Sequence, residues 1–259
     1  MQEMLKRRCE KYLSRYPRIF FSHVPKCAGV SLSKAIYSAV YPSVFKATRF
    51  ASHIDLPSSR ISAEILGIDM MKARESQLIT HLASPMMVYT NGHCIARPQV
   101  VSKFCPQWHF VTVLRDPVDR FISEYVYNRY KASEWLKNDE DIATYLSSDR
   151  AVAAGMTYAK YFSGIDDPQA MLHSPDEAVS KAVANLKQFA VCGTLDNMAA
   201  WENTFNNTFN TRISIANRNT SPNKSANAEI TSNSEVMAKI TALCDIDQKI
   251  YNEVKSWAK

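Results

Sequence analysis

The sequence predicts an α/β fold in which a central parallel sheet is flanked by helices. Short runs rich in β-branched and aromatic residues recur along the 259-residue chain. Segments with apolar residues at helical spacing lie between several of these runs. The runs are continuously apolar rather than alternating, which is typical of parallel strands with both faces buried.

Five segments read as strands. They are Arg18–Val24, Met86–Thr90, His109–Leu114, Phe189–Cys192 and Arg212–Ile215. After the first of them, apolar residues recur at helical spacing until Pro42 stops the helix. After the third, Asp116 is expected to cap a helix that begins with Pro117.

The C-terminal part is expected to be one long helix, from about Ser234 to Trp257, with Ser232 and Glu235 spaced as a capping box. The polar segment Asn203–Ser234 reads either as a surface loop or as a loop that covers a ligand. No internal repeat or domain boundary is visible. We therefore expect a single domain over residues 1–259, with residues 1–17 as a helical extension.

Composition fits a soluble globular protein, with 46% hydrophobic and 22% charged residues. The net charge of +6 permits an anionic ligand, but no basic run is dense enough to indicate nucleic-acid binding. No apolar run approaches the roughly 18 residues of a membrane span. The six cysteines include no CxxC pair, which argues against a zinc site or a disulfide framework. The cysteine pattern and a charged N-terminal segment unlike a signal peptide together favour a cytoplasmic protein. The oligomeric state stays open.

The first candidate site follows the first predicted strand. There Lys26 precedes a turn of small residues, Ala28 and Gly29, and a helix then opens with Ser31 in its first turn. Backbone N–H groups at a helix start, an ammonium and a hydroxyl together can bind an anion. The pattern is not the GxxxxGK[ST] loop of nucleoside triphosphatases, because the lysine precedes the glycine. Taken alone, it equally fits an ordinary strand-to-helix turn.

The second candidate site follows the third predicted strand. Arg115 stands at the strand end, beside a helix N-terminus, and Ser123 lies on that helix. An arginine in this position is suited to bidentate binding of a phosphate. The alternative is an arginine paired with Asp116 or Asp119.

Taken together, the segments HVPKCAGVSL (23–32) and LRDPVDRFISEY (114–125) resemble the 5′-phosphosulfate and 3′-phosphate motifs of the sulfotransferase superfamily. The chain is most similar to the carbohydrate branch that contains heparan sulfate and uronyl 2-O-sulfotransferases. Four further stretches agree in order: YTNGHC (89–94), YAKYFSGI (158–165), FAVCGTLDNM (189–198) and LCDIDQKIY (243–251). The resemblance implies a P-loop-like fold. It also implies 3′-phosphoadenosine 5′-phosphosulfate (PAPS) as donor, its desulfated form PAP as product, a carbohydrate acceptor and no metal.

The resemblance also implies which residues contact the donor. The loop around the 5′-phosphosulfate would consist of Lys26, Ala28, Gly29, Val30, Ser31 and Leu32. The 3′-phosphate would be held by Arg115 and Ser123, with Gly193 and Thr194 near the adenine. A closing loop would supply Arg218, Thr220 and Lys224.

Two positions depart from the family loop, which usually has threonines where this chain has Cys27 and Val30. Val30 removes one hydroxyl, so Ser31 carries the remaining side-chain hydroxyl of the loop. The thiol of Cys27, beside a lysine and a helix start, is expected to have a lowered pKa, unless it is packed and inert.

Sulfuryl transfer needs a base for the acceptor hydroxyl and a positive charge near the leaving oxygen. Lys26 is the candidate for the charge. His93, which follows the second predicted strand, is the candidate base, as in a similar GH motif of the 2-O-sulfotransferases; a purely structural histidine is the other interpretation. His53 is the alternative base, then Glu64, and His23 is expected to be structural.

Two other functions are compatible with the sequence. A nucleotide-dependent kinase-like phosphotransferase would share a phosphate-binding loop, although the sequence offers no clear magnesium-binding acidic residue. A non-catalytic module that binds PAP or PAPS would keep the fold without turnover.

Overall fold

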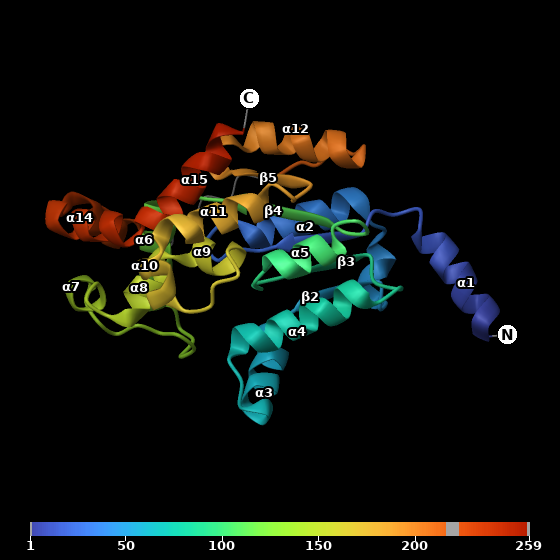
Figure 1. Cartoon of the computed structure of the whole chain (residues 1–259), viewed down its shortest axis with the longest axis horizontal. Helices are drawn as coiled ribbons and strands as arrows, with labels where there is room; N and C mark the ends of the chain where they lie inside the picture. The colour runs from blue at the N-terminus through green and yellow to red at the C-terminus, as the bar shows by residue number, and fades with distance from the viewer. Residues whose placement is uncertain (1, 216–222, 258–259) are drawn as a thin grey trace.

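The computed structural model describes residues 2–215 and 223–257, and it confirms an α/β fold built on one central sheet (Figure 1). All five strands are parallel, in the order β2-β3-β1-β4-β5. The strands are β1 (Ile19–Ser22), β2 (Ala51–Ile54), β3 (Tyr89–Gly92), β4 (His109–Leu114) and β5 (Val191–Thr194).

Helices flank this sheet (Figure 1). The longer ones are α1 (Gln2–Leu13), α2 (Gly29–Val40), α3 (Leu56–Leu66), α4 (Met70–Ala83), α6 (Pro117–Tyr130), α11 (Pro175–Leu186), α12 (Met198–Phe209), α13 (Lys224–Ser232), α14 (Ser234–Leu243) and α15 (Asp245–Ser256). The shorter ones are η1 (Ser43–Ala47), α5 (Pro98–Phe104), α7 (Ile142–Tyr145), α8 (Asp149–Gly155), α9 (Thr157–Phe162), α10 (Pro168–His173) and η2 (Leu195–Asn197).

The strand order brings the two predicted anion-binding segments together. β1 is the central strand and pairs with β3 on one side and β4 on the other. Because all strands run the same way, their carboxyl ends meet at one edge. The connection after β1 leads to one side of the sheet and the connection after β4 leads to the other, so a topological switch point lies between β1 and β4. Ligands of open α/β sheets bind at such a point.

The core explains why β1 and β4 are continuously apolar. Ile19, Phe20 and Phe21 of β1 are at most 1% exposed, and the Phe20 ring packs edge-on against Phe110 of β4. A second apolar cluster fixes α6, where Phe121 and its neighbours pack against α13 and α14. The helix that follows the second candidate site is therefore anchored along its length.

Two strand predictions need correction. Ala51–Ile54 forms the edge strand β2. The sequence does not reveal this strand, because its four residues, ASHI, include two polar ones and form no apolar run; most of them are partly exposed. Arg212–Ile215 is not a strand. Its backbone is held by the polar end of α12 instead, since Ile213 N–H donates to the Asn206 side chain at 2.7 Å.

Predictions of helix ends have mixed outcomes. Asp116 caps α6 as expected, accepting from the N–H groups of Val118 and Asp119, and Pro117 is the first helical residue. The predicted capping box is wrong. Ser232 ends α13, and the Asn233 side chain caps α14 by accepting from two N–H groups of its first turn.

The C-terminal half departs from the prediction in two further respects. The long C-terminal helix is interrupted at Cys244, where α14 ends and α15 begins. Most of the described part of the predicted loop Asn203–Ser234 is helical, because α12 and α13 occupy it.

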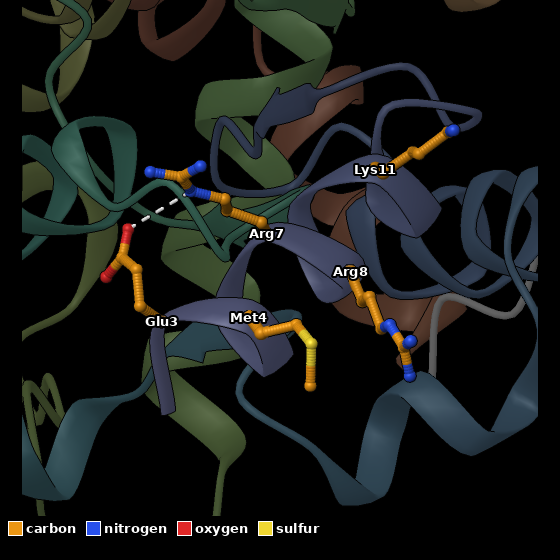
Figure 2. Close-up of a pocket in the computed structure, with 5 residues that line it drawn as sticks. All are labelled: Glu3, Met4, Arg7, Arg8 and Lys11. Atoms are coloured by element: carbon orange, nitrogen blue, oxygen red, sulfur yellow. Dashed lines mark hydrogen bonds and ion pairs between the residues drawn. The ribbon is translucent and has the colours of Figure 1, made fainter. Parts of the chain in front are cut away.

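The N-terminal extension contains α1, which projects away from the sheet in Figure 1. Only its last residue, Leu13, is buried. A hollow on α1 is lined by Glu3, Met4, Arg7, Arg8 and Lys11, with an exposed ion pair between Arg7 and Glu3 (Figure 2). Since α1 leads into the amino end of β1, this hollow lies apart from the carboxyl edge of the sheet. In the described part of the chain, no helix combines the length and apolar character required to cross a bilayer.

Candidate functional site

The turn after β1 has backbone angles that allow a ligand to approach the main chain closely. Lys26 and Ala28 both have positive φ, 66° and 55°, and Ala28 precedes α2 without a capping side chain. The first N–H groups of α2 therefore lack a side-chain cap, which leaves them available to an anion. Gly29 is required here because a Cβ atom would lie 1.6 Å from Cδ2 of His23.

The remaining residues of this predicted loop differ in what they can contribute. The side chain of Leu32 is fully buried in the core, whereas that of Val30 is 66% exposed. Ser31 is partly buried in the first turn of α2. Leu32 and Val30 are thus suited to bind a ligand through their backbone, and Ser31 can also use its hydroxyl.

The Lys26 ammonium lies over an aromatic ring. Its Nζ is 3.9 Å from the centre of the Tyr127 ring on α6, a cation–π distance. Burial lowers the pKa of Lys26, and the charges of Arg115 and Lys131 act in the same direction while Glu124 opposes them. The charge of Lys26 thus interacts with that of Arg115, so the two candidate sites influence each other electrostatically.

Arg115 leaves β4 beside the start of α6. Its only ion pair in the described part of the chain is a long contact of 3.9 Å with the exposed Asp119 carboxylate. A contact of this kind contributes little energy, so the guanidinium is free to bind an incoming phosphate. Ser123 is partly buried on α6.

His93 follows β3 and is tethered through one ring nitrogen. Its Nδ1 lies 2.7 Å from the backbone carbonyl oxygen of His23. A carbonyl can only accept, so Nδ1 carries the proton and Nε2 of the neutral ring keeps a lone pair. Burial lowers the pKa of His93 to about 4, so the ring is neutral at pH 7. This tautomer and charge are those that a general base requires.

The other candidate bases are less suited to that role. The centre of the His23 ring lies 4.0 Å from that of the His93 ring, with the planes tilted by 36°, and His23 fills the space beside Gly29. Burial lowers its pKa to about 2, so its ring is a poor proton acceptor. His53 lies on the edge strand β2, exposed, with Nδ1 2.6 Å from Asn91 Oδ1. Glu64 is exposed on α3.

The pKa of His93 predicts how stability responds to acid. Between about pH 4 and 6.5 the unfolded chain binds a proton at this residue and the folded protein does not. The free energy of unfolding should therefore fall by about 1.4 kcal/mol for each pH unit lost in that window, through this residue alone. Urea unfolding at several pH values checks this against a His93→Asn variant, which cannot titrate. Parallel curves for the two proteins would contradict the assigned pKa.

The predicted adenine-side residues lie at the end of β5, next to β4. Thr194 pairs in register with Leu114, which immediately precedes Arg115. A Cβ at Gly193 would approach Trp201 to 3.1 Å, and Thr194 is 1% exposed. Their side-chain positions are therefore packed, so a ligand contact here would use the backbone.

The predicted closing loop falls largely outside the described residues. Arg218 and Thr220 belong to the segment 216–222, which is not described. Lys224 is the first residue of α13, and its side chain is likewise outside the description.

Of the two interpretations of Cys27, the lowered thiol pKa is wrong and the packed side chain is found. Its side chain is 1% exposed, and burial raises the pKa of the thiol. Sγ lies 3.6 Å from the Tyr158 hydroxyl and 3.6 Å from the Pro25 carbonyl oxygen. The residue faces the core rather than the helix start, so the helix dipole does not activate it.

Sequence reasoning missed three residues that contact or influence the site: Tyr127, Glu124 and Tyr158. Glu124 had one signal, its i,i+4 spacing from Arg120, with which it forms an ion pair on α6. Its negative charge partly opposes the lowering of the pKa values of Lys26 and His93 by burial. Tyr127 and Tyr158 reach the site only through tertiary packing.

Among the described residues, no cluster of three or more His, Cys, Asp or Glu side chains could hold a metal ion. Comparison of the chain with protein-family models finds no match, and comparison with curated proteins finds none either.

Proposed function

We propose that this protein is a sulfotransferase that moves a sulfuryl group from PAPS to a hydroxyl of a carbohydrate acceptor and releases PAP. The observation that carries the proposal is the meeting of three strand ends. The Lys26 turn follows β1, Arg115 follows β4 and His93 follows β3, and β1 lies between the other two. Two turns suited to bind an anion and a neutral, oriented imidazole therefore share one edge of the sheet, which supports the proposal. The carbohydrate class of acceptor rests on the resemblance to the 2-O-sulfotransferases.

The residues have distinct tasks in the proposed reaction. The acceptor oxygen attacks sulfur as the bond between sulfur and the bridging phosphate oxygen breaks. Nε2 of His93 takes the acceptor proton, while Nδ1–H stays bonded to the His23 carbonyl and fixes the ring. The Lys26 ammonium stabilises the negative charge that develops on the leaving oxygen. Arg115 binds the 3′-phosphate through its side chain.

Ligand binding tests the donor directly. A thermal-shift titration should show stabilisation by PAP of about 2.7 kcal/mol at a concentration 100 times its dissociation constant. ATP and GTP serve as comparison ligands. Stabilisation by ATP without any by PAP would replace the proposal with a kinase-like phosphotransferase. If PAP binds, turnover of radiolabelled PAPS against a panel of glycans separates an enzyme from a binding module.

Arg115→Ala should weaken PAP far more than adenosine 5′-phosphosulfate, which has no 3′-phosphate. Loss of a charge-assisted contact costs about 1.5–3 kcal/mol, which is more than about tenfold in the dissociation constant. Calorimetry with both ligands measures the difference, and Asp119→Ala is the matched control because Asp119 is the acidic partner of Arg115. Equal losses for both ligands would remove Arg115 from the 3′-phosphate site.

A further inference from the structure

Tyr158 on α9 joins the two anion-binding turns through one hydroxyl. That hydroxyl accepts a hydrogen bond from the Arg115 N–H at 2.9 Å and donates one to the Arg115 carbonyl oxygen. It also lies 3.6 Å from Sγ of Cys27, the residue after Lys26. A single buried oxygen atom thus contacts the backbone of the β4–α6 turn and the side chain next to Lys26.

The position of this hydroxyl is fixed by contacts of Tyr158 with α15 and α6. Tyr158 is fully buried, and its N–H donates to the Asp247 carboxylate of α15 at 2.8 Å. The next residue, Ala159, donates to the same carboxylate at 3.0 Å, so Asp247 holds the first turn of α9. Arg120 of α6 lies 5.9 Å from the centre of the Tyr158 ring. These contacts fix the position of the Tyr158 ring relative to α6 and α15.

We propose that Tyr158 is a positioning residue that holds the Lys26 turn and Arg115 at the separation required by a ligand with two phosphate groups. This inference rests on the proposed function, in which the 5′- and 3′-phosphates bind the two turns. A ligand that bridges two sites gains affinity because its second contact is intramolecular, and that gain is lost when the sites no longer match the ligand. Tyr158 acts through the backbone of Arg115 and through Cys27.

Tyr158→Phe removes the link and keeps the aromatic ring in the core. It leaves the Arg115 N–H and carbonyl without their partner, which favours a displaced turn. Tyr161→Phe is the matched control. Tyr161 is another buried tyrosine of α9, and its hydroxyl has no hydrogen bond to any residue that the structure describes. Asp247→Asn is the second test variant, because it weakens the anchor of α9 without touching the hydroxyl.

The first measurement needs no nucleotide. Native-state labelling by a maleimide, read by peptide mass spectrometry, follows Cys27 together with Cys94 and Cys244, which are also buried. Tyr158→Phe should label Cys27 at least about tenfold faster than wild type, while Cys94 and Cys244 keep their rates. Asp247→Asn should give the same pattern, and Tyr161→Phe should label like wild type. Unchanged labelling of Cys27, or equal acceleration of all three cysteines through global opening, would overturn the proposal.

The second measurement compares PAP with adenosine 5′-phosphate by calorimetry. In wild type PAP should bind more tightly, and in Tyr158→Phe that preference should shrink by about tenfold. Tyr161→Phe should keep it. A preserved preference in Tyr158→Phe would overturn the positioning role. If wild type binds neither ligand, the proposed function fails, and the labelling result alone then decides whether Tyr158 holds the two turns together.

Discussion

Lys26→Ala should lower turnover by about 10²–10³, while the dissociation constant of PAP changes much less. The ammonium is held at the turn by the Tyr127 ring, 3.9 Å away, close to where the leaving oxygen would develop charge. Negative charge on that oxygen exists mainly in the transition state, so the lost interaction acts on rate more than on ground-state binding. Burial strengthens the effect, because the partly buried charge is less screened by water.

Turnover assays and PAP isotherms on the same preparation measure the two effects. Lys131→Ala is the matched control, since its ammonium lies 5.5 Å from the same Tyr127 ring but outside the turn. It should retain most of the activity. A Lys26→Ala variant that loses PAP binding and turnover in equal proportion would make Lys26 a binding residue without a role in the chemical step.

His93→Asn should bind PAP normally and lose about 10²–10⁴ in turnover, the range for a positioned general base. Asparagine is the informative replacement because its amide nitrogen can take the place of Nδ1 and donate to the His23 carbonyl. The position of Nε2 is then empty, so the structural hydrogen bond and the base are separated. In the wild-type protein, the proposed activity should persist in mild acid and fall only as His93 protonates, with a pKa of about 4.

The control for this experiment is His53→Asn, which changes the exposed histidine of β2 and should leave turnover near the parental value. If His93→Asn turns over normally and His53→Asn does not, the base is His53. If His93→Asn loses PAP binding as well, the residue is structural. A pH–rate profile with its acid limb near 6.5 would contradict the buried environment assigned to His93.

Features governed by neighbouring residues could be predicted from the sequence. The cap of α6 is local, since Asp116 accepts from N–H groups two and three residues ahead and Pro117 needs no N–H partner there. The strands β1 and β4 were recognisable because burial on both faces demands unbroken apolar runs. Edge strand β2 escaped recognition for the opposite reason, as an edge position tolerates polar side chains.

Properties of the candidate site that depend on distant partners were decided by tertiary structure. The protonated nitrogen of His93 is set by a carbonyl 70 residues away, and the Arg115 turn is held by a hydroxyl 43 residues away. The sequence neighbours of Cys27, a lysine and a helix start, predict a lowered thiol pKa, yet burial in the core raises it. The sequence by itself determined the α/β class and the strand-to-helix turns that follow β1 and β4, because local patterns of burial and capping encode them. Tertiary structure decided how these turns lie relative to each other and which protonation states His93 and Cys27 adopt. The physical reason is that hydrogen bonding and desolvation depend on which distant residues come into contact.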